Sequence, residues 1–375
     1  MTQADEAWAP TDGELPPPAD PGTRRRRWSW GGRSGGPSSG GSSSDGSSSG
    51  DRSSGGRWSW GKDARGSSTW RRGWVLAGLA ALIALLLGFH RQVPNSVGNF
   101  GSLLETFLPW LGLALPVLLV PALLRRSATA LIALLLPVVV WTVLFGGLLG
   151  DKSGGTGDFT ALTHNVSADN PDPAGTVRQL NASGAQLVAL EELTGAALPA
   201  YTSGLAAKYP YHVVEGTVGL WSSYPLSDTR VVDIRIGWTR AFRTQVATPQ
   251  GPLAVYVAHL PSVRVKFDAG FTAGQRDVSA QALGDAIEAE PLQKVLLLGD
   301  LNGTMNDRAL APVTSQLRSA QGSAGSGFGF SWPSGFPMAR IDQIMSRGMK
   351  PTGSWVLPAD GSDHRAIAAA YRYNR

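Results

Sequence analysis

The segment Val295-Leu296-Leu297-Leu298-Gly299-Asp300-Leu301-Asn302 decides how the rest of this chain is interpreted. Its apolar run predicts a buried strand, and an acid and an amide emerge at the carboxyl end of that strand. Because side chains alternate along an extended chain, Asp300 and Asn302 are expected to point the same way and to converge on one ligand. Later in the chain, Ser362-Asp363-His364 precedes a final apolar strand, and the two segments together indicate hydrolytic chemistry.

The amino-acid composition of the 375 residues changes along the chain. Residues 1–73 consist mainly of Ser, Gly, Pro and Arg, with almost no aliphatic side chains. Such a segment cannot bury enough apolar surface to offset the loss of chain entropy. We therefore expect a disordered tail over residues 1–73.

Three apolar stretches follow within residues 74–150, namely 74–89, 103–124 and 128–149. The second covers 22 residues, and at about 1.5 Å per residue it would extend roughly 33 Å, enough to cross the apolar core of a bilayer. These lengths and the near absence of charge favour three transmembrane helices over the buried helices of a soluble bundle. Their prolines are tolerated in a membrane bundle.

The basic residues around these stretches predict an orientation. Arg71 and Arg72 precede the first stretch, and Arg125 and Arg126 lie between the second and the third, whereas only Arg91 lies between the first and the second. The positive-inside rule then places the N-terminus in the cytoplasm. The sequence thus predicts a multi-pass plasma-membrane protein in which residues 151–375 form an extracellular domain, and the absence of cysteine is compatible with this location.

The charge of residues 151–375 argues against a nucleic-acid partner. Of 33 basic and 28 acidic residues in the chain, 14 and 9 precede residue 151, which leaves 19 of each sign in this domain. A protein that holds a long nucleic acid usually presents a basic face. Nucleic acid is therefore the less expected partner.

Residues 151–375 alternate short apolar strands with few helices, which predicts an α+β fold or a layered α/β sandwich. The expected strands are 158–166, 187–190, 211–214, 218–222, 230–236, 242–248, 253–259, 295–298, 341–345 and 366–371, and the expected helices are 175–183 and 268–290.

Polar side chains close several of these strands. Asn165 ends the first strand, Glu192 follows the second, His259 ends 253–259, and Asp342 lies inside 341–345. Taken singly, each has an ordinary structural explanation, such as a turn cap, a helix start or an edge histidine. As a set, their carboxylates and amides favour Mg²⁺ or Mn²⁺ over zinc, which would require more His or Cys.

In this order the motifs resemble the endonuclease/exonuclease/phosphatase superfamily, which includes DNase I, exonuclease III, sphingomyelinases and inositol-phosphate 5-phosphatases. The resemblance extends from Thr163-His164-Asn165-Val166 to Ser362-Asp363-His364. It implies a DNase I-like sandwich of two packed mixed sheets flanked by helices. Glu191 departs from the pattern, because Gln is usual there. No Tyr-containing motif of exonuclease III is evident near His259, which disfavours abasic-site repair.

The resemblance also implies a metal-dependent phosphoester hydrolase. Glu192 would hold a Mg²⁺ or Mn²⁺ ion, with Asn165 and Asp363 close to it, and the metal would neutralise the phosphoryl oxygens. Asp300 would accept a proton from the attacking water, and Asn302 would orient that water or the phosphate.

Two histidines complete the implied site. His364, held by Asp342, would donate to the phosphoryl group as charge develops, and His259 would contribute from the other side. Candidates for the substrate rim, each with an ordinary structural explanation when taken alone, are Tyr211, Trp221, Arg243, Arg264, Lys266, Phe267 and Trp332.

The short segment between the last expected span and the first strand indicates a substrate class. Residues 151–157 link the last expected span to the first strand, and fully extended they reach about 25 Å. The domain would therefore stay at the outer leaflet, where a lipid-linked phosphate is present at high effective concentration. Three spans followed by such a domain also resemble the VanJ-type membrane proteins of actinobacteria, which suggests an undecaprenyl diphosphate-type substrate and protection against cell-wall antibiotics such as glycopeptides.

Other interpretations remain open on sequence grounds. If the first strand stands upright, Asn165 lies at its far end from the tether and the site points away from the bilayer. An extracytoplasmic endonuclease or nucleotide phosphodiesterase would use the same residues. A non-catalytic binding module is a third possibility, disfavoured because every acid and base of the pattern is present.

Overall fold

The computed structural model describes residues 71–96, 98–266 and 270–373. All described residues belong to one compact unit, Ser59–Arg375. The expectation of a disordered tail over residues 1–73 falls almost wholly outside the described residues.

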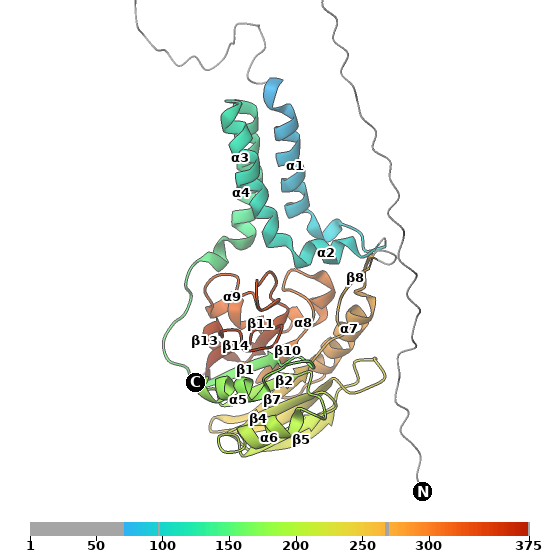
Figure 1. Ribbon diagram of the computed structural model, residues 1–375, viewed down its shortest axis with the longest axis vertical. Helices are drawn as coiled ribbons and strands as arrows, with labels where there is room; N and C mark the ends of the chain where they lie inside the picture. The colour runs from blue at the N-terminus through green and yellow to red at the C-terminus, as the bar shows by residue number, and fades with distance from the viewer. Residues whose placement is uncertain (1–70, 97, 267–269, 374–375) are drawn as a thin grey trace, which may run out of the picture. The chain divides into compact units, whose positions relative to one another are not determined.

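The apolar first part of the described chain is helical (Figure 1). By length and composition, α4 (Ala128–Leu149) is able to cross a membrane, whereas α1 (Trp74–Gly88) has only 15 residues. Small residues such as Ala80 and Ala130 let these two helices pack closely. The remaining segments are η1 (Arg71–Gly73), η2 (His90–Gln92), α2 (Phe100–Thr106), η3 (Leu108–Leu113) and α3 (Ala114–Leu124).

The second expected span, residues 103–124, is broken. The segments Phe100–Thr106 and Leu108–Leu124 are bent by 71°. Pro109 accounts for the break, because it has no N–H to donate to the carbonyl of Glu105 four residues earlier. That carbonyl instead accepts a hydrogen bond from the Thr304 hydroxyl at 3.3 Å. In the described part of the chain, one of the three expected helices is thus long enough to span alone, and the bent pair provides at most a second.

The rest of the described chain forms a sandwich of two six-stranded sheets, ordered β13-β14-β1-β2-β4-β3 and β11-β12-β10-β7-β6-β5. Both sheets are mixed: β1 runs parallel to β2 and antiparallel to β14, and β10 runs parallel to β7 and antiparallel to β12. The predicted α+β sandwich of two mixed sheets is therefore confirmed.

The strands of the first sheet are β1 (Phe159–Asn165), β2 (Leu187–Glu191), β3 (Tyr211–Glu215), β4 (Val218–Ser222), β13 (Met349–Val356) and β14 (Ile367–Tyr373). Those of the second are β5 (Leu226–Val231), β6 (Ala241–Thr248), β7 (Gly251–Ala258), β10 (Val295–Asp300), β11 (Arg318–Ser319) and β12 (Asp342–Arg347). A separate two-stranded ribbon consists of β8 (Val265–Lys266) and β9 (Gly270–Phe271).

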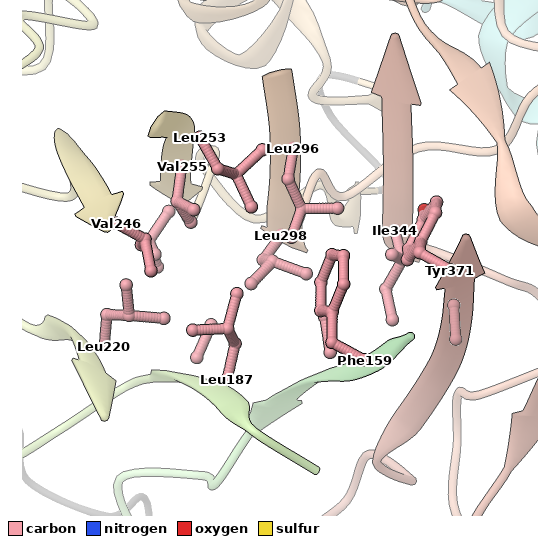
Figure 2. Packing of buried hydrophobic residues seen from close by; sticks show 14 of the residues in the cluster. Phe159, Leu187, Leu220, Val246, Leu253, Val255, Leu296, Leu298, Ile344 and Tyr371 are labelled. Carbon is pink, nitrogen blue, oxygen red and sulfur yellow. The ribbon is translucent and has the colours of Figure 1, made fainter. Parts of the chain in front are cut away.

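Apolar side chains of both sheets fill the space between them (Figure 2). Phe159 and Leu187 enter this core from the first sheet, and Leu296 and Leu298 enter it from β10. Leu297, which alternates with them, is buried in a second cluster on the other face of its sheet. Because β10 is buried on both faces, its sequence is an uninterrupted apolar run.

Helices cover the outer faces of the sandwich. Side chains of α5 (Pro173–Ala182) and α6 (Leu198–Leu205) pack on the first sheet, and those of α7 (Gly274–Glu288) pack on the second. The short helices η4 (Arg308–Leu310), α8 (Ala311–Thr314) and α9 (Ala320–Ala324) lie between β10 and β12 in the chain.

Differences from the predicted elements lie at the sheet edges. The strand expected at 230–236 is shifted to β5 (Leu226–Val231), the edge strand of the second sheet. β13 was not predicted, because its Met-Lys-Pro-Thr-Gly-Ser-Trp-Val sequence has a weak strand pattern. It is also an edge strand, where Pro351 is tolerated because one side of the backbone needs no partner.

Candidate active site

The carboxyl ends of β1, β2 and β10 meet at one edge of the sandwich. Asn165, the last residue of β1, pairs in register with Glu191 at the end of β2, and Glu192 follows directly. The side-chain Nδ2 of Asn165 donates to Glu192 Oε1 and to Asp300 Oδ2, both at 3.1 Å. One amide therefore joins a carboxylate that follows the first sheet to a carboxylate of the second.

A close backbone contact fixes the position of Asp300. The preceding residue, Gly299, has φ +147°, and a Cβ there would lie 1.9 Å from the carbonyl oxygen of Ala258 on β7. Only glycine allows β10 to approach β7 this closely. Asp300 itself is 1% exposed, so its carboxylate is held in an interior position at the end of the strand.

Asn302 reaches the site by a route that differs from the predicted one. β10 ends at Asp300, and Asn302 lies in a turn with φ +47°. Its backbone N–H donates to Asp300 Oδ1 at 2.8 Å, and its Nδ2 donates to the Leu260 carbonyl at 2.9 Å. The prediction that strand alternation aligns the two side chains was therefore wrong, although both line the same pocket.

His364 and Asp342 form a buried pair. His364 Nδ1 lies 3.0 Å from Asp342 Oδ2, which also accepts a hydrogen bond from the Ser331 hydroxyl. His364 Nε2 is 3.8 Å from Asp300 Oδ2. Burial lowers the pKa of His364, but the carboxylates of Asp342 and Asp300 outweigh it and raise the pKa to about 10. The imidazole is therefore positively charged at neutral pH.

Asp300 has a different electrostatic environment from its partner carboxylate. Burial and the nearby Asp342 raise the pKa of Asp300 to about 6. Burial also raises the pKa of Asp342, but the contact with His364 outweighs it, and the pKa falls below its ordinary value of 3.8. At neutral pH, Asp342 is a fixed anion and Asp300 is ionised yet able to take up a proton.

His259 lies on the opposite side of Asp300. Its Nε2 is 3.7 Å from both Glu192 Oε1 and Asp300 Oδ2, and its ring contacts the guanidinium of Arg240. Burial, followed by the charges of Arg240 and His364, lowers the pKa of His259 well below 6.5. The ring is neutral. Arg240 was not predicted, because nothing in the sequence around it indicates proximity to His259.

Glu191 lies beneath the site, at the end of β2. The Thr163 hydroxyl donates to Glu191 Oε1 at 2.7 Å, and the side chain is fully buried. Burial raises the pKa of Glu191 well above 4.5, and the bond from Thr163 offsets this only in part. A glutamic acid side chain has nearly the shape of a glutamine side chain, so the departure from the superfamily pattern is conservative in shape.

A pocket of about 510 Å³ opens over these residues. Glu192, Asp363, Asp300 and His364 line it, whereas Asn165 supports two of these carboxylates from behind. The full lining is Thr106, Phe107, Ser167, Asp169, Glu192, Ser262, Val263, Arg264, Asp300, Asn302, Trp332, Ile341, Asp363 and His364. Thr106 and Phe107 come from the apolar helical part of the chain and were not predicted.

The donor set suits a hard divalent cation. The carboxylates of Glu192, Asp300 and Asp363 line the pocket, and Glu192 is linked to Asp300 through Asn165. Ligand atoms of Asp300, Asp342 and His364 also lie within 4.8 Å of one another, but the charged imidazole of His364 is paired with Asp342 and offers no lone pair to a metal. Within the described residues, no Lys or Arg forms an ion pair with Glu192, Asp300 or Asp363. Oxygen-rich sites of this kind fit Mg²⁺ or Mn²⁺.

The predicted rim residues divide into two groups. Arg264 and Trp332 line the pocket. Trp221 is instead buried beneath the first sheet, and Arg243 is engaged by Glu290 at 2.9 Å. Tyr211 lies on the edge strand β3, outside the pocket lining. The side chains of Lys266 and Phe267 fall outside the described part of the chain.

Two mixed sheets packed face to face, with acids, an amide and histidines gathered at one edge, define a DNase I-like fold. The chain belongs to the Endonuclease/Exonuclease/phosphatase family, which matches residues 162–364, more than half of its length. Members of this superfamily are metal-dependent phosphoester hydrolases. No protein with a curated description matches the chain.

Several solved structures are similar to this chain. Danio rerio TDP2 complexed with a single-strand DNA product is 18% identical and covers 57% of this chain and 98% of its own, with a TM-score of 0.49. An endonuclease/exonuclease/phosphatase from Bacteroides vulgatus is 14% identical, covering 58% and 99%, with a TM-score of 0.49. Sphingomyelinase C from Streptomyces griseocarneus is 18% identical, covering 56% and 98%, with a TM-score of 0.44.

Proposed function

We propose that this protein is a membrane-anchored, divalent-metal-dependent phosphoester hydrolase that acts outside the cytoplasm on a lipid-linked phosphate or diphosphate. One observation carries the substrate class. Thr106 and Phe107, from the apolar helical part of the chain, line the same pocket as Asp300 and His364. A phosphate bound in this pocket lies against that helical part, so a phosphate attached to a membrane lipid can reach it from the bilayer surface.

The path of the tether supports this orientation. The Gly154 N–H donates to the Thr352 carbonyl at 2.8 Å, and Arg372 Nη2 donates to the Thr156 carbonyl at 2.8 Å. Residues 151–157 therefore run along the β13–β14 edge before β1 begins (Figure 1). Asn165, at the far end of β1, bonds to Glu192 and Asp300, and these two residues line the same pocket as Thr106 and Phe107 of the helical part.

Glu192 and Asp363 would hold the cation at the pocket, and Asn165 keeps the Glu192 carboxylate in place through its 3.1 Å hydrogen bond. A bound divalent cation neutralises the phosphoryl oxygens and stabilises the oxygen that leaves. Mg²⁺ is the cation we propose, with Mn²⁺ as a substitute.

Four side chains of the protein carry out the remaining steps of the reaction. Asp300, with a pKa of about 6, accepts a proton as a water oxygen bonds to phosphorus and the bond to the leaving oxygen breaks. His364, charged and held by Asp342, donates a hydrogen bond to the phosphoryl oxygen where negative charge increases. Asn302 orients the water or the phosphate, and neutral His259 supports the phosphate from the other side.

The membrane topology is part of the proposal. We infer three crossings, formed by α1 with its flanking residues, the bent α2–α3 segment and α4, with the N-terminus in the cytoplasm and the hydrolase domain outside. This arrangement resembles the VanJ-type membrane proteins. It favours an undecaprenyl diphosphate-type carrier as the substrate and a role in carrier recycling or glycopeptide resistance.

A substrate panel tests the proposal with the full chain purified in detergent. We expect phosphate release from a polyprenyl diphosphate with Mg²⁺, and no release by the Asp300→Ala and His364→Ala variants. Plasmid DNA, a nucleotide diester and sphingomyelin serve as the competing substrates. Rapid DNA or nucleotide cleavage without release from the lipid would replace this proposal with an extracytoplasmic nuclease or nucleotide phosphodiesterase.

A further inference from the structure

A second cavity, of about 170 Å³, lies between the apolar helices and the hydrolase domain. Phe145 and Leu148, near the end of α4, form one side, and Met305, Phe328 and Phe330 of the domain form the other. Phe328 stacks on Phe330 with ring centroids 5.1 Å apart and contacts Phe145 at 5.8 Å. Aromatic rings that support one another in this way keep the cavity walls in place.

The second cavity adjoins the catalytic pocket, because Thr106 lines both. The Thr106 hydroxyl already donates to the Ser102 carbonyl within α2, at 2.9 Å. It therefore requires no polar partner from either cavity. A molecule that passes Thr106 would have its polar end beside Asp300 and His364 and its other end among the phenylalanines.

Most of the cavity wall is formed by phenylalanine, leucine and methionine side chains, which favours an apolar occupant. A water molecule needs two to four polar partners, and apolar cavities of roughly 150 Å³ stay dry and bind molecules the size of benzene. The amide N–H groups of Gln321 and Gln343, which also border the cavity, donate to backbone carbonyls, whereas their Oε1 atoms have no hydrogen-bond partner in the described part of the chain. Arg340 donates to the Gly329 carbonyl at 2.8 Å and interacts electrostatically with Asp342.

We propose that this cavity, defined here as the chain subsite, binds the hydrocarbon segment next to the phosphate of a lipid-linked phosphate. This assignment rests on the proposed function and deepens it. The size of the chain subsite fits about one branched or ring-sized unit, so it selects the part of the lipid closest to the reacting phosphorus. Enzyme specificity would then favour an isoprenoid phosphate over a small soluble ester.

Gly322 offers a way to fill the chain subsite without disturbing the backbone. It lines the cavity, and an added Cβ would meet only Ser319, at 3.6 Å or more. Gly322→Phe should lower hydrolysis of a long-chain polyprenyl diphosphate at least tenfold and leave hydrolysis of a soluble phosphate ester unchanged. Gly274→Phe, at an exposed glycine of α7 with open space around its Cβ position, should change neither rate.

Photolabelling gives a readout that does not depend on turnover. A polyprenyl phosphate with a diazirine on its first unit should label Met305 or Phe328 in the full chain, and Gly322→Phe should block the label. Normal lipid hydrolysis without labelling, and with no effect of Gly322→Phe, would overturn the chain subsite and leave the proposed function standing. Labelling without any lipid hydrolysis would support the subsite and reject the proposed function.

The competing assignment for this cavity is an anion site at Arg340. The Nε and Nη2 atoms of Arg340 have no hydrogen-bond partner in the described part of the chain. An anion could bind there in place of a hydrocarbon. If Arg340→Met abolished the label and Gly322→Phe did not, the cavity would be an anion site and the hydrocarbon assignment would be wrong.

Discussion

The carboxylate of Glu105 accepts hydrogen bonds from Arg308 Nε at 3.0 and 3.2 Å and from the Arg308 backbone N–H at 3.0 Å. Glu105 belongs to α2 and Arg308 to η4 of the hydrolase domain, so this pair joins the two parts of the chain. His90 Nδ1 adds a contact at 3.3 Å. Glu105 is the one acidic residue between 74 and 150, and it is fully buried by these partners. The next two residues, Thr106 and Phe107, line the catalytic pocket.

Glu105→Gln should therefore weaken the wall of the pocket. Hydrogen bonds to a charged group contribute about 1.5–3 kcal/mol each, and loss of part of this energy should lower hydrolysis of a membrane-embedded lipid phosphate roughly tenfold. Hydrolysis of a soluble ester should change much less, because Asp300 and His364 are untouched. Glu288→Gln, at an exposed carboxylate of α7, is the matched control. An equal loss on both substrates would show that the pair supports the fold as a whole.

The pair of Asp342 and His364 leads to a prediction about pH. Asp342 is a main reason that the pKa of His364 is raised to about 10, so Asp342→Asn should lower that pKa. If activity requires charged His364, the alkaline limb of the rate–pH profile moves to lower pH, and kcat falls by about 10²–10⁴. Full kcat profiles from pH 6 to 10 test this. An alkaline limb that does not move would exclude His364 as the titrating group.

Metal removal should abolish activity reversibly. EDTA should remove the cation that the carboxylates of the pocket bind and should stop phosphate release. Addition of Mg²⁺ or Mn²⁺ should then restore it. Glu192→Gln should raise the metal concentration for half-maximal activity at least about tenfold. Glu288→Gln, at an exposed carboxylate outside the pocket lining, should titrate like the wild type. Full turnover after exhaustive chelation would contradict the metal proposal.

Much of the candidate site was predictable because it follows from strand ends. Asn165, Glu192, Asp300 and His364 each sit where an apolar strand meets a loop, and parallel strands such as β1 and β2 bring their carboxyl ends to the same edge. The apolar run before Gly299 also indicated a strand covered on both faces. The local sequence therefore indicated which residues stand at strand ends, and the strand directions explain why these residues meet at one edge of the sandwich.

What the sequence could not show depends on contacts between distant segments. The run 103–124 is apolar apart from Glu105 and Thr106, and its sequence does not show that it bends. The break at Pro109 depends on Thr304, from a distant segment, which donates to the carbonyl of Glu105. Arg243 and Trp221 were plausible rim residues, yet the partners that bury them come from elsewhere in the fold. Whether a large polar or aromatic side chain lines a pocket is decided by which sheet face it occupies.

Arg243 in turn forms the buried pair that should govern acid stability. Its Nε and Nη2 donate to Glu290 at 2.9 and 3.0 Å, and the two side chains are 4% and 1% exposed. Burial raises the pKa of Glu290, but the bonds from Arg243 and the Leu292 N–H outweigh it, so the pKa lies below 4.5. A carboxylate with a lowered folded-state pKa stabilises the protein fully above its unfolded-state pKa, and this contribution is lost as the pH falls through the folded-state pKa.

Glu290→Gln should therefore destabilise the protein by about 3 kcal/mol at neutral pH, because it leaves the buried guanidinium of Arg243 without its main counter-charge. The difference in stability between the wild type and this variant should stay constant above about pH 5 and shrink as the pH falls below 4.5, since the wild type then loses the same interaction. Thermal unfolding of the full chain in detergent from pH 7 to 3 measures both quantities. Glu288→Gln, two residues away and exposed, should unfold like the wild type at every pH. A gap between wild type and Glu290→Gln that persisted unchanged at pH 3 would mean that packing around Glu290, and not its charge, provides the stability.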